Sequence, residues 1–168
     1  MKPKVSIIMG STSDLPVMEK ACQVLDDFQI PFEMNALSAH RTPDAVEEFA
    51  KNAAGRGIEV IIAGAGMAAH LAGVIAAMTP VPVIGVPIKS SFDGMDALLA
   101  MVQMPPGIPV ATVAVNGAMN AGILAAQILA SGDASLKEKI IVFKEGLKKK
   151  IVDANAKLAE VEYKYKTN

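Results

Sequence analysis

The sequence predicts an α/β fold, a three-layer α/β/α sandwich built around a five-stranded parallel sheet. Short apolar runs alternate with stretches of helical spacing, and the alternation repeats five times. Strands that are joined through helices form parallel sheets with right-handed crossovers. The bulk composition agrees, because 168 residues with 52% hydrophobic and 20% charged residues suit one folded domain with a sizeable core.

Five short apolar runs are the predicted strands. Residues 5–9, 60–63 and 83–86 are continuously apolar, which is typical of strands that helices cover on both faces. Residues 32–37 and 110–115 complete the set. The sheet is therefore expected to lie buried between two layers of helices.

Five helices are predicted between and after these strands. In the first, residues 15–25, apolar side chains recur every three or four positions and Pro16 lies in the first turn. In the second, Thr42 is the predicted N-cap before Pro43, and Gly57 is the predicted stop. The other three are predicted at about residues 69–78, 95–103 and 119–130.

A sixth helix is predicted over residues 135–165, where apolar side chains alternate steps of three and four. Its length of roughly 45 Å exceeds the width of a domain of this size, so part of its apolar stripe is expected to pack on another subunit. The alternative is a bent helix that wraps its own domain. The expected organisation is one catalytic domain, 1–168, with an α/β core at 4–130 and this C-terminal helix.

Composition argues against several classes of function. The formal net charge is −1 and no basic stripe is present, unlike a protein that binds a nucleic-acid duplex. One cysteine and two histidines, without CxxC or HxxxH spacing, argue against a metal site, and the lone Cys22 suits a reducing compartment. The first apolar run is too short for a signal peptide or a membrane span. We therefore expect a cytoplasmic protein without membrane association.

Loops that follow the strands are the candidate site, because ligands of parallel α/β sheets bind beyond the carboxyl ends of the strands. These loops are residues 10–14, 38–42, 64–69 and 88–94. The first, Gly10-Ser11-Thr12-Ser13-Asp14, offers hydroxyls and free N–H groups at a helix N-terminus, a favourable place for an anion. Ser and Asp are also common N-caps, so a capped helix without a ligand is the alternative.

The second loop, residues 38–42, holds one of the two histidines and one of the two arginines. Arg41 suits bidentate binding of a phosphate or carboxylate. His40 is of the type that carries protons near neutral pH. Both lie where a ligand is expected, which favours function over two polar residues on a surface loop.

The third loop, residues 64–70, matches the dinucleotide pattern GxGxxA only weakly. It follows the third strand, and no Asp or Glu lies between Glu59 and Asp93 to bind a ribose. Its glycines are equally explained by close approach of the backbone to a ligand. His70 is expected to begin the third helix, either as a packed or capping side chain or as a group in the site.

Together these loops resemble a known family. The motifs GSTSD (10–14), SAHRTP (38–43), GAG (64–66), AHL (69–71), and QMP (103–105) followed by GIPV (107–110) occur in order and at the expected places. This combination resembles the N5-carboxyaminoimidazole ribonucleotide mutases of bacterial purine biosynthesis over about residues 4–130. The long C-terminal helix is similar in kind.

The resemblance implies a flavodoxin-like subunit of a homo-octamer, with a ribonucleotide substrate and with sites shared between neighbours. It implies no metal, no ATP and no organic cofactor. It also implies that His40 is the catalytic acid and base. The implied substrate-binding residues are Ser11, Ser13, Asp14, Ser38, Ala39, Arg41, Gly64, Gly66, Ala69, His70 and Leu71.

Some positions depart from common members of the family. Met67 stands where many relatives have Gly, Ala72 where many have Pro, and the loop at 89–92 differs in detail. The related carboxylases, which use free CO₂ on aminoimidazole ribonucleotide, typically have Lys after the histidine, so Arg41 and the Gly64-Ala65-Gly66 loop favour a mutase.

Two further alternatives remain at this point. One is a flavodoxin-like protein that binds FMN, although Trp is absent and both tyrosines lie among the last six residues. The other is a nucleotide-binding or assembly module without catalysis, which leaves the adjacent His40 and Arg41 unexplained.

Overall fold

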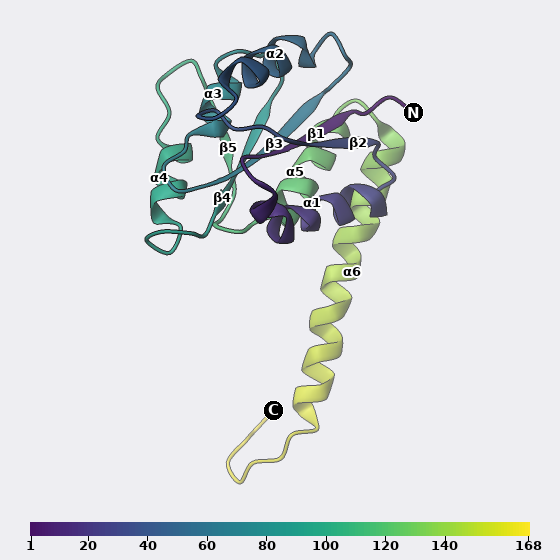
Figure 1. The fold of residues 1–168 in the computed structure, drawn as a ribbon. Helices are drawn as coiled ribbons and strands as arrows, with labels where there is room; N and C mark the ends of the chain where they lie inside the picture. Colours follow the sequence, from purple (N-terminus) through teal and green to yellow (C-terminus); the bar gives the residue numbers. More distant parts are fainter. The chain divides into compact units, whose positions relative to one another are not determined.

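The computed structural model describes residues 1–168 and confirms the predicted fold class (Figure 1). Five parallel strands form one sheet in the order β2-β1-β3-β4-β5. The chain divides into two compact units, Met1–Leu129 and Ala130–Asn168. The first holds the whole sheet and five of the six α-helices.

All five predicted strands are present, with shifted ends. The strands are β1 (Val5–Met9), β2 (Phe32–Ala36), β3 (Val60–Gly66), β4 (Val83–Ile88) and β5 (Ala111–Thr112). The central strands β3 and β4 run further toward their carboxyl ends than predicted, because their pairing continues to Gly66 and Ile88. Small residues and proline at these ends hid that continuation from the apolar pattern.

The edge strand β5 is shorter than predicted. Regular pairing with β4 ends at Thr112. The chain nevertheless continues beside β4, since the Val113 N–H donates to the Gly85 carbonyl (3.0 Å) and the Asn116 N–H to the Pro87 carbonyl (2.8 Å). The spacing of three residues between these two bonds is not that of a strand, and Asn116 has a left-handed φ of 57°.

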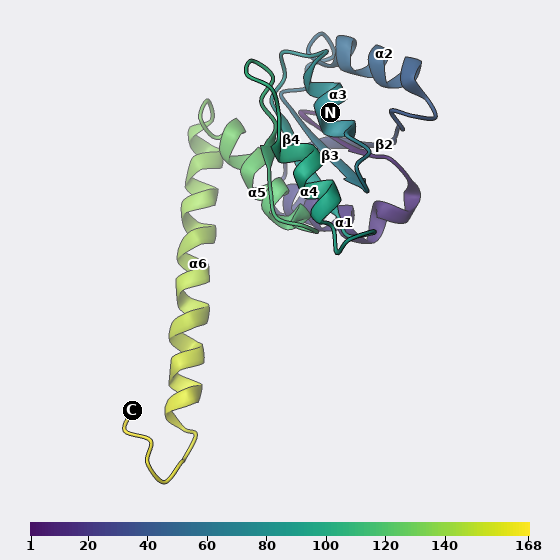
Figure 2. The same cartoon turned by 90° about the vertical axis from the view of Figure 1, so that its left-hand side faces the viewer.

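The helices of the first unit cover both faces of the sheet (Figures 1 and 2). They are α1 (Leu15–Asp27), α2 (Pro43–Ala53), α3 (Leu71–Ala76), α4 (Met95–Val102) and α5 (Ala118–Leu129), with the short 3₁₀ helix η1 (Thr12–Asp14) before α1. Helices α1 and α5 pack against each other on one face. Helices α2, α3 and α4 share one apolar core with the other face.

The alternation of side chains along the strands explains these two layers. Ile8, Ile61 and Ala63 are fully buried and belong to the core beneath α2, α3 and α4. Their neighbours Ile7 and Ile62 are equally buried and point to the opposite face, because successive strand residues alternate. Both faces are therefore apolar, as the continuous hydrophobic runs predicted.

Helix ends follow local chemistry, with two corrections to the predictions. Gly57 has φ 91° and its N–H bonds the Ala54 carbonyl, which confirms it as the glycine that ends the turn after α2. Thr42 lies at the N-cap position of α2, but its side chain makes no cap hydrogen bond. Helix α3 begins at Leu71, later than predicted, because Met67 and His70 have left-handed φ values of 56° and 54°, which an α-helix excludes.

The second unit contains α6 (Ala134–Ala159), capped by the Asp133 carboxylate, which accepts from the Leu136 N–H at 3.0 Å. The helix ends before the predicted residue 165. At Glu160 and Val161 the backbone bonds shift to partners three residues back. Beyond that point lie the exposed Tyr163 and Tyr165, whose aromatic type has a lower helix propensity than Ala or Leu. No helix is both long and apolar enough to cross a membrane.

Candidate functional site

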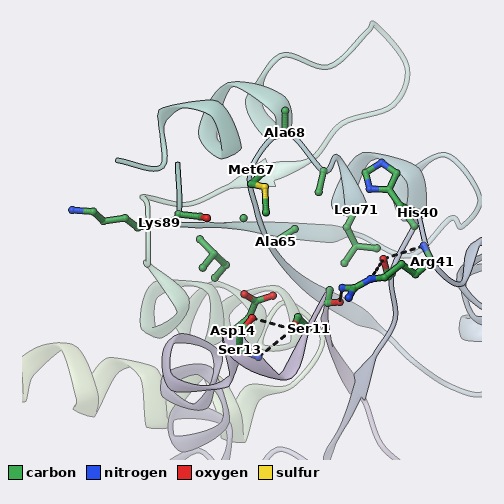
Figure 3. A pocket seen from close by; sticks show the side chains of 17 residues that line it. Ser11, Ser13, Asp14, His40, Arg41, Ala65, Met67, Ala68, Leu71 and Lys89 are labelled. Atoms are coloured by element: carbon green, nitrogen blue, oxygen red, sulfur yellow. Dashed lines mark hydrogen bonds between the residues drawn. The ribbon is translucent and has the colours of Figure 1, made fainter. Parts of the chain in front are cut away.

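A cavity of about 750 Å³ lies at the carboxyl edge of the sheet (Figure 3). Its volume is within the range of pockets that take small molecules. It lies where the chain leaves β1 and β3, the two neighbouring strands at which the strand order reverses. The residues that line it are Gly10, Ser11, Ser13, Asp14, Ser38, Ala39, His40, Arg41, Ala65, Gly66, Met67, Ala68, Ala69, Leu71, Ile88, Lys89 and Ser90.

All four loops singled out from the sequence contribute to this lining, and most of the predicted site residues are in it. Gly64 and His70 are the exceptions. Gly64 lies inside β3, where a Cβ would stand 2.4 Å from Met18 Sδ. The glycine therefore admits the buried Met18 side chain beneath the site.

The first loop presents hydroxyls and one carboxylate. The Ser11 hydroxyl accepts hydrogen bonds from the Ser13 N–H (3.3 Å) and the Ser13 hydroxyl (3.0 Å), so Ser11 caps η1. Burial raises the pKa of the Asp14 carboxyl above its ordinary value of 3.8, while hydrogen bonds from the Ser11 backbone and the Ser13 side chain and the charge of Arg41 oppose that rise. The loop therefore holds an acceptor whose charge is poorly solvated.

The second loop fixes the guanidinium of Arg41. Its Nη2 donates to the Gly10 carbonyl (2.8 Å) and its Nε to the Ser38 hydroxyl (3.3 Å). A guanidinium has five N–H donors, so three remain for a ligand. The contact with Gly10 joins the loop after β2 to the loop after β1, and it sets the cation beside Ser11 and Asp14 in the cavity (Figure 3).

The Ser38 hydroxyl is left with a hydrogen to give. It accepts from the Arg41 N–H (3.2 Å) as well as from Arg41 Nε. A hydroxyl has two acceptor positions and one donor. Both acceptor positions are occupied, so the O–H is oriented to donate, and an anion in the cavity is a suitable acceptor.

His40 is exposed at the cavity and its imidazole makes no hydrogen bond (Figure 3). It lies between Ala39, which packs against the core, and Arg41. The imidazole is thus held only through the backbone of its loop, and both ring nitrogens are available to a ligand.

His70 points to another partner. Its Nδ1 lies 2.7 Å from the Ala100 carbonyl oxygen. A carbonyl only accepts, so Nδ1 carries the hydrogen, and the bond satisfies one of the carbonyls that the end of α4 leaves free. A Cβ on Gly73 would stand 2.3 Å from the ring. The residue therefore anchors the end of the third loop to α4.

Reasoning from the sequence singled out no residue of the fourth loop, but Lys89 and Ser90 line the cavity. The Asn116 side chain accepts a hydrogen bond from the Lys89 N–H at 2.9 Å. Lys89 Nζ pairs with the Asp93 carboxylate at 2.9 Å, and this contact raises the pKa of Lys89. A lysine directly after a buried strand was the available signal. No group of three or more His, Cys, Asp or Glu side chains is placed to hold a metal ion.

Comparisons with known proteins agree on one family. The family model described as AIR carboxylase matches residues 4–150. The N5-carboxyaminoimidazole ribonucleotide mutase of Pyrococcus abyssi is 60% identical over 148 residues, which cover 88% of this chain and 85% of that protein. The phosphoribosylaminoimidazole carboxylase of Candida glabrata is 53% identical over 163 residues, 96% of this chain but 29% of that protein.

The fold has solved counterparts as well. The crystal structure of Treponema denticola PurE2-S38D superposes with a TM-score of 0.83 at 30% sequence identity. The match covers 94% of this chain and 99% of the other. The relationship therefore extends through the sheet and its helices and is not confined to the motifs around the cavity.

Proposed function

Because the chain belongs to the AIR carboxylase family, we propose that it converts N5-carboxyaminoimidazole ribonucleotide to 4-carboxy-5-aminoimidazole ribonucleotide in purine biosynthesis. It is an isomerase of the mutase type. The observation that carries the proposal at the level of chemistry is a histidine with an unengaged imidazole beside a fixed arginine in one cavity. The 60% identity to a mutase, over 85% of the length of that protein, supports the same interpretation.

The reaction needs one proton carrier. Protonation of the carbamate nitrogen by the imidazolium of His40 breaks the N–CO₂ bond and releases CO₂. The ring carbon, which is enamine-like, then attacks that CO₂ and forms the new C–C bond. The same imidazole then removes the proton from the ring carbon and returns to its protonated form, so no co-reactant is needed.

The anionic parts of the substrate match the donors on the cavity wall. Arg41 and the Ser11 region would bind the phosphate, with the Ser38 hydroxyl as a further donor. Asp14 would accept hydrogen bonds from the ribose hydroxyls. The backbone of residues 65–69 and Leu71 would enclose the ring. Roles for all of these residues rest on their positions in the motifs and in the cavity.

The CO₂ must stay beside the ring between the two steps, which is a matter of proximity and of excluding water. Ala65, Met67, Ala69 and Leu71 give the cavity an apolar wall. Transfer of a small apolar molecule such as CO₂ from this wall into water is unfavourable. No metal, ATP or organic cofactor enters this chemistry.

Direct carboxylation of aminoimidazole ribonucleotide by CO₂ is the second candidate. It is favoured by the 53% identity to the Candida glabrata carboxylase, of which this chain spans less than a third. The two activities share the ring chemistry and differ in the source of CO₂. Arg41 after His40 supports the mutase.

The proposal includes a cytoplasmic homo-oligomer, an octamer by resemblance, with sites that neighbouring subunits share. Its support within the chain is the number of exposed apolar side chains on α6, among them Val142, Ile151 and Val152, which are 65–70% exposed. Exposed apolar patches mark interaction surfaces.

The test is a metal-free and ATP-free assay with the carbamate ribonucleotide, run beside aminoimidazole ribonucleotide with bicarbonate. Wild-type protein is expected to turn over the carbamate, and His40→Asn to lower kcat by about 100- to 10,000-fold. Calorimetry should show that His40→Asn still binds the ribonucleotide, because the bonds of Arg41 do not involve the imidazole.

Other outcomes would redirect the assignment. Turnover only at high bicarbonate would make the protein a carboxylase. Binding without turnover in either assay would revive the nucleotide-binding module. A His40→Asn variant with wild-type kcat would remove His40 from the mechanism.

A further inference from the structure

The position of His40 depends on the conformation of the five residues Ser38–Thr42, here named the histidine loop. Arg41 is tied by its own side chain to Gly10 and Ser38. The imidazole of His40 has no such bond, and the residue is exposed. Whatever closes the histidine loop therefore decides where the imidazole lies relative to the cavity.

The Thr42 hydroxyl closes this loop from both sides. It accepts a hydrogen bond from the Ser38 N–H at 3.0 Å and donates one to the Ser38 carbonyl at 3.1 Å. The Thr42 N–H adds a third bond between the two residues, the second to the Ser38 carbonyl, at 2.8 Å. One side chain thus joins the last residue of the loop to both backbone groups of the first.

This use of the hydroxyl replaces the role expected from the sequence. A threonine at an N-cap ordinarily accepts from a backbone N–H of the first helical turn, and that bond is absent in α2. Side chains of this type can bond neighbouring backbone groups instead. The hydroxyl faces back into the histidine loop and leaves the helix uncapped, although a cap would stabilise α2 by about 1 kcal/mol.

We propose that Thr42 is a positioning residue that holds His40 at the cavity through its two hydrogen bonds to the Ser38 backbone. This inference rests on the proposed function, in which His40 carries the proton. Loss of the hydroxyl leaves in place the bond from Arg41 Nη2 to the Gly10 carbonyl, which lies outside the histidine loop. The effect should therefore fall on the proton-transfer steps and spare the binding of the phosphate group.

The first variant pair separates the hydroxyl from the shape of the side chain. Thr42→Val keeps the volume and removes the two hydrogen bonds of the hydroxyl. Thr42→Ser keeps the hydroxyl. We expect Thr42→Val to lower kcat about tenfold or more, since misplacement of a reacting group by about 1 Å is costly. KM and the inhibition constant of inorganic phosphate should change less than about threefold. Thr42→Ser should recover kcat to within about threefold of wild type.

Thr79→Val is the matched control. The Thr79 hydroxyl also accepts from a backbone N–H, that of Val81 at 3.3 Å. It lies between α3 and β4, at the end of β4 opposite to the cavity. We expect Thr79→Val to leave kcat at the wild-type value even if it lowers the melting temperature as much as Thr42→Val does.

A measurement without turnover keeps the inference independent of the reaction. The chain has two histidines, so ring signals of ¹³C-labelled His40 and His70 can be assigned with His40→Asn. Thr42→Val should move or broaden the His40 signal and leave that of His70, which Ala100 anchors, unchanged. If wild-type protein shows no turnover, the proposed function fails, and this signal alone decides the role of Thr42.

Three results would overturn the inference. Wild-type kcat in folded Thr42→Val would show that the hydroxyl is dispensable. Equal loss in Thr42→Val and in Thr42→Ser, which keeps the hydroxyl, would show that the two hydroxyl bonds do not by themselves position His40. An unchanged His40 signal in Thr42→Val would show that other contacts place the imidazole. If Thr42→Val does not fold, Thr42→Ala and the same ring signal replace it.

Discussion

At the residue scale, the cavity holds one carboxylate, that of Asp14, among hydrogen-bond donors that suit an anion. Asp14 is partly buried beside Arg41, and burial raises its pKa despite that charge and the hydrogen bonds of its own loop. In the folded chain the ionised carboxylate is therefore less stable than it is in the unfolded chain. Hydrogen bonds from a ligand to this carboxylate would offset that cost.

Asp14→Asn should consequently stabilise the empty protein at neutral pH while it weakens substrate binding. A folded-state pKa above the unfolded value contributes stability below the unfolded pKa, here the ordinary value of 3.8, and this contribution is lost as the pH rises through the folded pKa. Asparagine removes that loss. Melting temperatures measured from about pH 3.5 to about pH 8 should show that Asp14→Asn melts above wild type at pH 7 and that this difference shrinks toward acid pH.

Glu47→Gln is the reference of opposite sign. Lys51 lowers the pKa of Glu47 by a hydrogen bond and by charge, so the stabilisation is present above the unfolded pKa and is lost as the pH falls through the folded value. Because the pair is exposed, its contribution to the free energy of unfolding should be small. An Asp14→Asn protein that melts below wild type at pH 7 would show that the carboxylate stabilises the empty site.

The sequence identified residue types in this site better than it identified their partners. Ser11, Asp14, His40 and Arg41 were predicted from the loops after strands, and all line the cavity. The bond from His70 to Ala100 spans thirty residues and leaves no local pattern. Only the packing of α3 beside α4 brings these groups together.

At the element scale, α1 and α5 approach closely because Gly122 lacks a side chain. A Cβ at this position would lie 2.9 Å from Val24 Cβ and 3.1 Å from the Ala21 carbonyl oxygen. Ala21 and Ala125 are fully buried and small. The two helices thus form one tight layer against the sheet, with α1 against β1 and α5 against β3 and β4.

Gly122→Ala should therefore destabilise the protein, even though alanine favours a helix by about 1 kcal/mol over glycine. Overpacking against the backbone of α1 is expected to cost about 1–3 kcal/mol. Gly146→Ala in α6 is the matched control, because nothing lies within 4 Å of its Cβ position, and it should be neutral or stabilising.

Urea unfolding followed by circular dichroism measures both variants. A lower midpoint for Gly122→Ala with an unchanged or higher midpoint for Gly146→Ala is the expected result. Equal shifts in the two would mean that helix propensity outweighs the contact with α1.

Elements were predictable where periodicity decides and less so where loops decide. The strands β1, β3 and β4 and the helices α1 and α5 follow from apolar pattern. The boundaries of α3 depend on left-handed residues, Met67 and His70, and these are of types that a sequence does not mark as helix breakers. Thr42 was predicted at the right position but with the wrong partner, because a cap and a loop closure call for the same side chain.

At the scale of the whole molecule, the second unit carries apolar side chains that are largely exposed. Val142, Ile151 and Val152 of α6 are 65–70% exposed, and Leu158 is 59% exposed. A helix of 26 residues extends over about 39 Å. Such a surface is expected to be covered by other subunits in the proposed oligomer.

A double variant, Ile151→Lys with Val152→Lys, should shift the protein to smaller species in sedimentation velocity, because charge at an apolar interface is costly. Asn155→Lys adds a charge to the same helix without removing an apolar side chain and should sediment as wild type. Unchanged assembly of the double variant would exclude these positions from the contact, and a monomeric wild type would refute the oligomer.

The position of the two tyrosines gives the protein an unusual optical property. Tyr163 and Tyr165 follow α6 in the second unit, and the chain has no tryptophan. Intrinsic fluorescence therefore originates in the last six residues and is blind to the sheet and the cavity. A tryptophan introduced at exposed Phe92, in the loop after β4, would be the only indole in the chain. Its emission would therefore report on that loop alone.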